Sequence, residues 1–142
     1  MSGLAVACAS QTGRLQGSSF RIRDRYSPRD KHRPRRPYTR YIVLHTTEGT
    51  QEGSLRKIWR RGEAHYFVCT DGLVYRIIHK SKIATHAGRS MWEGNGPVDH
   101  YAVGIEIVGF HDRDITPAQY DAVRELLRQL QSVYRIPDER VV

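Results

Sequence analysis

From residue 38 onward, the chain alternates between apolar runs with strand spacing and segments with helical spacing. Short apolar runs rich in β-branched and aromatic residues predict strands at 41–45, 65–69, 73–78 and 101–109. Thr70-Asp71-Gly72 lies between the second and third runs and predicts the turn of a β-hairpin. A further short strand is expected at 83–88, and the turn-forming residues at 89–100 predict a loop.

Two segments have helical spacing. Residues 54–61 predict a short helix with Ser54 as N-cap and Gly62 as terminator. A longer helix begins at Thr116-Pro117-Ala118-Gln119, a capping box with proline at the first helical position. It is expected to end near Arg135, because the proline two residues later cannot continue a helix. Its apolar positions are predicted to face the core, namely Val123, Leu126, Leu127, Leu130 and Val133.

The order strand, helix, hairpin, strand, strand, helix predicts one α/β (α+β) domain with a central mixed β-sheet flanked by helices. A length of 142 residues suits a single domain, and a hydrophobic fraction of 39% lets it fold without metal or disulfides. The final residues, 138–142, have the character of the start of one more strand. We expect a monomer.

Charge divides the chain near residue 40. The net charge of +8 comes from residues 1–40, which hold ten basic and two acidic residues, whereas 41–142 hold thirteen of each. A nucleic-acid-binding domain carries its positive charge on the folded surface, so no nucleic-acid partner is predicted. Residues 1–37 are expected to be a disordered basic segment, either a linker or an arm for anionic envelope polymers, and 38–142 the folded domain.

The first eight residues, MSGLAVAC, resemble the end of a bacterial lipoprotein or secretion signal, in which the cysteine receives the lipid. The alternative is an ordinary apolar terminus. No apolar stretch reaches the length of a membrane-spanning helix, so contact with a membrane is expected only if Cys8 is lipidated.

Four polar residues at strand ends or within strands are candidates for chemistry: His45, His65, His86 and Glu106. Each histidine could instead be an ordinary hydrogen-bonded residue. Strand alternation puts Glu106 on the face opposite to its apolar neighbours, and a buried carboxyl has a raised pKa that suits a general base. Three histidines and a carboxylate converging from separate segments could form a hydrolytic zinc site.

Several motifs, in order, resemble the zinc-dependent N-acetylmuramoyl-L-alanine amidases of type 2, a family that includes the peptidoglycan recognition proteins. The resemblance runs from about Tyr41 to the end of the chain. The motifs that carry it are YIVLHTTEG, EAHYFVCTDGLVYRII, THAGRS, VGIEIVG and the helix opening TPAQY. Any one of these motifs is weak, but all of them in register make a chance match improbable.

The resemblance implies a bacterial cell-envelope protein that uses Zn²⁺ to hydrolyse the amide between N-acetylmuramic acid and L-alanine in peptidoglycan or muropeptides. It places a zinc ligand on His45 and the catalytic base on Glu106. His65 takes the position of oxyanion stabilisation, with Tyr66 as the alternative, and His86 and Tyr66 are expected to contact substrate. Zinc would polarise the carbonyl and lower the pKa of the attacking water.

Two departures from the family pattern leave alternatives open. Asp99 and Ala102 stand where the family usually has asparagine and serine. The family's other two zinc ligands, a histidine and then an aspartate or cysteine, are expected beyond Val142, so the domain is predicted to be C-terminally incomplete. The alternative function is a non-catalytic peptidoglycan-binding module, although Glu106 favours the enzyme.

Overall fold

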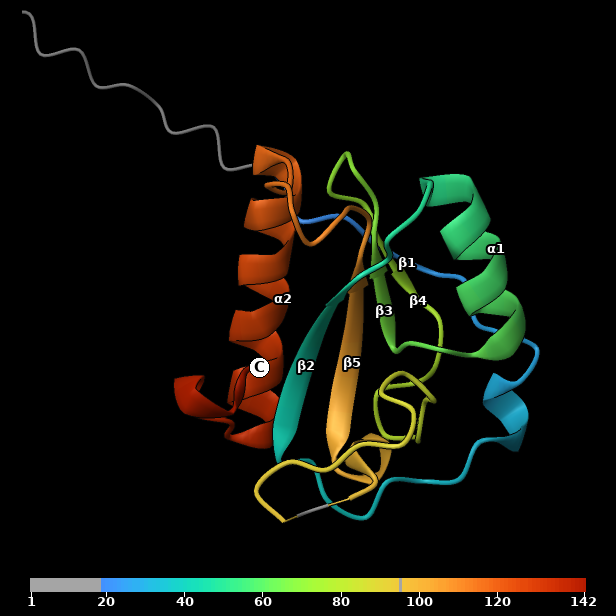
Figure 1. Cartoon of the computed structure of the whole chain (residues 1–142), viewed down its shortest axis with the longest axis vertical. Helices are drawn as coiled ribbons and strands as arrows, with labels where there is room; N and C mark the ends of the chain where they lie inside the picture. The colour runs from blue at the N-terminus through green and yellow to red at the C-terminus, as the bar shows by residue number, and fades with distance from the viewer. Residues whose placement is uncertain (1–18, 95) are drawn as a thin grey trace, which may run out of the picture.

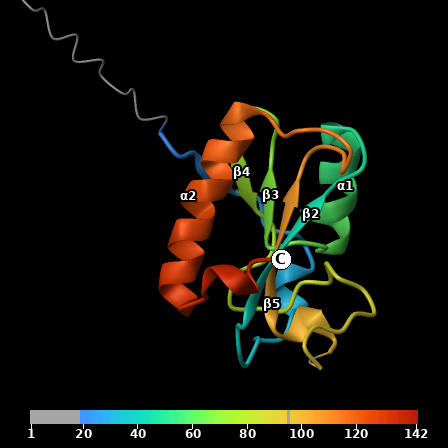
Figure 2. The same cartoon turned by 60° about the vertical axis from the view of Figure 1, so that its left-hand side comes forward.

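The computed structural model describes residues 19–94 and 96–142, and within them two helices lie on opposite faces of one five-stranded sheet (Figures 1 and 2). Helix α1 (Gln51–Arg61) covers one face and helix α2 (Pro117–Tyr134) the other. The strands are β1 (Ile22–Asp24), β2 (Tyr41–Thr46), β3 (Tyr66–Val68), β4 (Val74–Arg76) and β5 (Ala102–Ile107). Short 3-10 turns are η1 (Asp30–His32), η2 (Val98–His100) and η3 (Asp138–Arg140). The predicted α/β domain with a mixed sheet is confirmed.

The strands are ordered β1-β4-β3-β5-β2 across the sheet. Strands β3 and β4 form the predicted antiparallel hairpin, and the other neighbours are parallel. In this register His45 lies opposite Glu106, which in turn lies opposite Phe67. Residues opposite one another in adjacent strands project from the same face, so the register alone brings His45 and Glu106 together.

Two apolar clusters hold the helices to the sheet. Val103, Ile105 and Ile107 of β5 pack with the inner face of α2, whereas Phe67 and Val108 belong to the cluster beneath α1. Glu106 alternates with the first group and therefore points to the α1 face, as predicted.

Helix α2 begins and ends as its sequence predicts. The Thr116 hydroxyl accepts a hydrogen bond from the Gln119 amide, and the Gln119 side chain accepts one from the Thr116 amide. Arg135 ends the helix in the left-handed conformation. Val133, however, is 60% exposed, so its predicted place in the core is wrong, since it lies on the outer side of the last turns.

Replacing Thr116 by alanine is expected to lower the free energy of unfolding by about 1 kcal/mol, because it removes the acceptor for an end-of-helix amide. The hydroxyl also donates to the carbonyl of Thr70, so the hairpin turn loses a contact as well. Urea denaturation measures the change. Val133→Ala on the same helix is the control and should change stability by no more than about 0.5 kcal/mol. Equal effects of the two substitutions would contradict the capping role.

The start of helix α1 and the segment 83–88 differ from the prediction. Helix α1 starts at Gln51 with Thr50 as N-cap, because the Thr50 hydroxyl accepts from the Gly53 amide, so Ser54 is a helical residue and not the cap. Gly62 ends the helix in the left-handed conformation, as predicted. The strand expected at 83–88 does not form, and this segment is irregular chain that crosses the α1 face.

The prediction that residues 1–37 are disordered is wrong for residues 19–37, while residues 1–18 lie outside the described residues. Strand β1 pairs with β4, and Ser27 and Arg36 are buried. The Arg36 guanidinium donates to the carbonyls of Lys80 and Lys82 and lies over the ring of Tyr134. The described residues before the predicted boundary at residue 38 are therefore part of the folded domain.

The end of the chain lies along the free edge of β2 (Figure 1). The Val142 amide donates to the Ile42 carbonyl at 2.9 Å, and the Leu44 amide donates to the Val142 carbonyl at 2.7 Å. This is parallel strand pairing at Val141 and Val142, whereas Asp138–Arg140, also expected to belong to a strand, form the 3-10 turn η3. Among the described residues, no helix is long and apolar enough to cross a membrane.

Candidate active site

The candidate site lies on the α1 face of the sheet, at the carboxyl ends of β2 and β5. Helix α1 covers the β3 and β4 side of that face. Over β2 and β5 the same face is covered by residues 84–94 and by residues 96–101, which include the turn η2; the first segment carries His86 and the second Asp99. His45 and Glu106 lie opposite one another in the register, and both are half-buried between helix α1 and the chain that carries His86 and Asp99.

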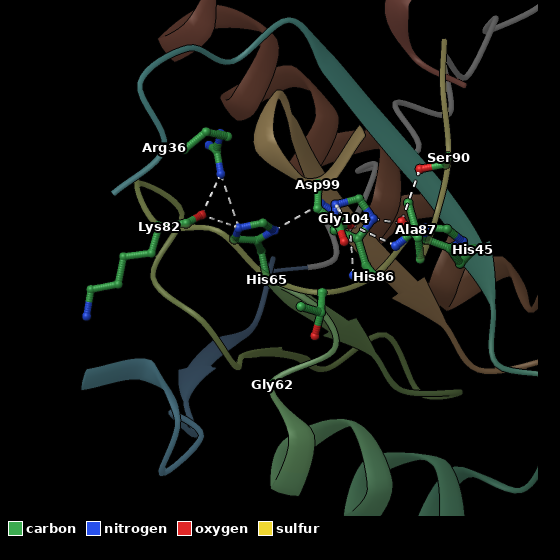
Figure 3. A network of polar contacts seen from close by, with 12 residues as sticks. Arg36, His45, Gly62, His65, Lys82, His86, Ala87, Ser90, Asp99 and Gly104 are labelled. Carbon is green, nitrogen blue, oxygen red and sulfur yellow. Dashed lines mark hydrogen bonds and ion pairs between the residues drawn. The ribbon is translucent and has the colours of Figure 1, made fainter. Parts of the chain in front are cut away.

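Three imidazoles form a row across this face, with His86 between His45 and His65 (Figure 3). The ring centroids are 5.3 Å apart for His45 and His86 and 5.9 Å apart for His86 and His65, both edge to face. The His45 Nε2 and His86 Nδ1 atoms lie within hydrogen-bond distance, at 3.1 Å. Convergence of these three histidines was one of the alternatives left open by the sequence, and the structure brings their rings together.

His65 is fully buried and bonded at both ring nitrogens. Its Nδ1 accepts from the Gly104 amide at 3.0 Å, so the ring proton is on Nε2, which donates to the Lys82 carbonyl at 2.7 Å. The Arg36 Nη1 atom lies 3.1 Å from Nε2 and donates to the same Lys82 carbonyl. Burial and this cation hold the pKa of His65 well below its usual value. Oxyanion stabilisation requires contact with substrate. The role predicted for His65 does not fit a buried ring whose two nitrogens both have hydrogen-bond partners within the protein.

Tyr66 and His86 also differ from their predicted contact with substrate. Tyr66 is 4% exposed and packs in the cluster beneath α2, on the opposite face of the sheet. The His86 side chain is fully buried, and its ring lies directly on Gly104. Burial lowers the pKa of His86 to about 4, against the opposing attraction of Asp99. Burial also lowers the pKa of His45, so both rings are neutral near pH 7.

Glu106 has the properties of a general base. Burial, with a smaller contribution from the negative charge of Glu63, raises the pKa of its carboxyl to about 7 against the opposing effect of Lys57. A carboxyl that titrates near neutral pH can take a proton from a weak acid and return it within one turnover. The raised pKa predicted from strand alternation is therefore confirmed.

The same shift predicts how stability depends on pH. Between pH 4.5 and about 7, folded Glu106 keeps a proton that the unfolded chain has released, so the free energy of unfolding falls as pH rises. We expect a loss of about 1–2 kcal/mol, discounted because the side chain is partly in contact with water. Glu106→Gln should remove this loss. Urea denaturation of both proteins at several pH values measures it, and parallel curves would contradict the assignment.

An apolar hollow of about 330 Å³ lies beside His45, and its walls include Val43, Met91, Trp92 and Val142. Met91 and Trp92 are largely exposed. This hollow is open to a ligand next to the site. A larger groove of about 1020 Å³ lies between α2 and the segment before β1, away from His45 and Glu106.

Sequence analysis missed two residues of the site. Asp99 was noted only as a departure from a family pattern, yet its carboxylate accepts from the amides of His86 and Ala87. Arg36 was assigned to a disordered segment. An acidic residue standing where the family has a neutral one was the available signal for Asp99, and nothing in the sequence pattern around Arg36 indicated burial.

The described residues do not by themselves complete a zinc site. Among them, no three His, Cys, Asp or Glu side chains lie close enough together to hold a metal ion. Of the predicted zinc ligands, the described residues contain His45 alone, and the predicted base Glu106 lies opposite it in the register.

Comparison with known proteins identifies the family of this chain. Residues 34–142 match the model of the Amidase_2 family, N-acetylmuramoyl-L-alanine amidase, and the chain belongs to this family. It is 30% identical over 83 residues to the 1,6-anhydro-N-acetylmuramyl-L-alanine amidase AmpD of Haemophilus influenzae, a match that covers 58% of this chain and 45% of AmpD. It is 22% identical over 156 residues to the N-acetylmuramoyl-L-alanine amidase AmiD of Escherichia coli, covering 98% of this chain and 55% of AmiD. The matched part is thus about half the length of these relatives.

Solved structures share the fold. A crystal structure of AmpD aligns with a TM-score of 0.70 at 22% identity, covering 84% of this chain and 79% of that chain. AmiD of E. coli, in complex with the substrate anhydro-N-acetylmuramic acid-L-Ala-D-γ-Glu-L-Lys, aligns with a TM-score of 0.68 at 24% identity, covering 75% and 48%. At these identities the likeness establishes the architecture.

Proposed function

We propose that this domain, in its complete form, hydrolyses the amide bond between N-acetylmuramic acid and L-alanine in peptidoglycan or its muropeptide fragments, and that it depends on zinc. The observation that carries the proposal is the pair His45 and Glu106, held side by side by the register of β2 and β5. Membership in the amidase family and the names of its relatives support the choice of substrate.

The chemistry assigned to this chain's own residues is proton transfer. Glu106, with a pKa of about 7, is ionised in a large fraction of molecules near neutral pH. It takes a proton from the water that attacks the amide carbonyl and passes it to the nitrogen of L-alanine as the carbon–nitrogen bond breaks. The half-buried site lowers the local dielectric, which strengthens each of these electrostatic interactions.

His45 is the proposed zinc ligand of this chain. Zinc, when bound, would supply a Lewis acid for the carbonyl. Val142 lies opposite Val43 in the parallel pairing with β2. In a strand that continues in this register, the second residue after Val142 would lie opposite His45 and project from the same face. A further ligand at that position is therefore geometrically compatible with the site.

The alternative is a module that binds peptidoglycan without cleaving it. The open apolar hollow with exposed Met91 and Trp92 favours binding of this kind, because it needs no metal. A carboxyl with a pKa near 7 would then have no use, which favours the enzyme.

The test uses a chain continued past Val142 along its reading frame, incubated with a defined muropeptide before and after removal of metal by a chelator. The proposal expects release of the peptide, loss of release on chelation, and recovery on addition of zinc. Binding of the muropeptide without release under any metal condition would establish the binding module. Full activity after chelation would overturn the zinc dependence alone.

Location in the cell envelope is part of the proposal and is supported by the substrate class and by the sequence MSGLAVAC, which lies outside the described residues. The monomeric state stays a prediction.

A further inference from the structure

We propose that Asp99 and His86 act as positioning residues for His45, through the series Asp99 carboxylate, His86 imidazole, His45 imidazole (Figure 3). They hold the proton of His45 on Nε2 and leave Nδ1 as its open nitrogen. Only the use of that nitrogen as a zinc donor rests on the proposed function. The arrangement itself is a property of the described chain.

The His86 ring is seated where it cannot contact a substrate. Its side chain is fully buried. A Cβ atom on Gly104 would lie 2.3–2.6 Å from three atoms of the ring, so the imidazole occupies the space that a side chain at position 104 would take. His86 therefore fills the sheet surface between His45 and His65, and its contacts are with the protein.

Asp99 fixes both the backbone and the proton of His86. One carboxylate oxygen, Oδ1, accepts from the amides of His86 at 3.0 Å and Ala87 at 2.8 Å. The same oxygen lies 3.5 Å from His86 Nε2, which is buried and has no direct hydrogen-bond partner among the described residues. A negative charge at this distance favours a proton on Nε2, because the alternative turns a lone pair toward a carboxylate in a buried site.

The proton on His86 then determines the direction of the next hydrogen bond. A neutral imidazole carries one proton, so with Nε2 protonated its Nδ1 can only accept. The group 3.1 Å from that Nδ1 is Nε2 of His45, which must therefore be the donor. His45 Nδ1 is left with its lone pair, and it makes no hydrogen bond to any described residue.

The opposite direction of the hydrogen bond between His86 and His45 is disfavoured for two reasons. If His86 donated from Nδ1, its buried Nε2 would face the Asp99 oxygen with no proton between two acceptors. His45 would then present an N–H at its open nitrogen, and an N–H cannot bind a metal ion. Metal-bound histidines generally donate their other N–H to a neighbouring acceptor, which sets the ring orientation. His86 supplies that acceptor here.

Nitrogen-15 NMR of the 142-residue chain, labelled at histidine, tests the proposal without any assay of activity. The spectrum is taken at about pH 8, above the ordinary histidine pKa of about 6.5, and His45 is assigned from the signals lost in His45→Gln. The expected result is a pyrrole-type shift at Nε2 of His45 and a pyridine-type shift at Nδ1. The reverse assignment would overturn the proposal, whereas the amidase proposal is tested separately by release of the peptide from a muropeptide.

Two variants test the cause of this tautomer. His86→Leu fills a similar space but removes the acceptor, so both His45 nitrogens should move to shifts averaged between the two tautomers. Asp99→Asn keeps an oxygen for the two amides and loses the charge, so it should move the His45 shifts in the same direction by less. His100→Gln, at an exposed position next to Asp99, is the control and should change nothing.

Unchanged His45 shifts in folded His86→Leu overturn the proposal. If circular dichroism shows that His86→Leu does not fold, the test rests on Asp99→Asn. Unchanged His45 shifts in that variant would then overturn the proposal.

Discussion

Replacing Glu106 by glutamine in a chain continued past Val142 is expected to reduce muropeptide hydrolysis by about 10²–10⁴-fold, the usual contribution of a general base. Glutamine has nearly the same shape but cannot take a proton from the attacking water. The fold should survive, because Glu106 is half-buried and makes no hydrogen bond within the described part of the chain that glutamine would break. The rate of peptide release at saturating substrate measures the effect.

Glu63→Gln is the matched control for this prediction. Glu63 is a neighbouring carboxylate whose charge raises the pKa of Glu106, and it is itself paired with Lys57 and Arg61. Its removal should lower the pKa of Glu106, so the acidic limb of the pH–rate profile should move to lower pH while the maximal rate changes little. Full activity of Glu106→Gln would show that another group is the base.

The second large effect is expected from Gly104→Ala, which should destabilise the fold by about 1–3 kcal/mol through overpacking. The added Cβ would fall 2.3 Å from the His86 ring, and the backbone of β5 cannot yield because it is paired on both sides, with β2 and β3. The ring must move instead, which breaks its contact with His45. Urea denaturation measures the loss of stability, and the nitrogen-15 shifts of His45 report the displacement.

A double-mutant cycle identifies the cause of that loss. If the clash with the imidazole is responsible, Gly104→Ala should cost much less in a His86→Ala background, since the space is then empty. Additive losses would place the strain elsewhere in β5. A Gly104→Ala protein as stable as the parent would contradict the seating of His86 on this glycine.

The local parts of the fold could be predicted because their causes lie within a few residues of one another. The capping box of Thr116 and Gln119 is complete within one helical turn. The alternation along VGIEIVG was enough to put Glu106 on the face opposite to Ile105. Arg36 could not be predicted in the same way. An arginine in a basic, proline-containing segment is expected to be exposed to solvent. The burial of Arg36 depends instead on the carbonyls of Lys80 and Lys82, which are distant in sequence.

The site shows the same division. His45 and Glu106 were identified because each interrupts or ends an apolar strand. The burial of His65 and His86 could not be predicted because it depends on other elements: Gly104 provides the space beneath His86, and Arg36 and Lys82 cover His65. Asp99 acts through backbone amides, a contact that leaves no spacing pattern in the sequence.

Cleavage of the lactyl amide, the proposed reaction, is identified by the chemical groups at the new ends of the products. A defined muropeptide is incubated with zinc and the chain continued past Val142, and the products are analysed by mass spectrometry. A peptide with a free amino group on L-alanine and a muramic acid with a free lactyl carboxylate are expected. Cleavage at a glycosidic bond or another peptide bond, or a bound but intact muropeptide, would rule out the proposed reaction.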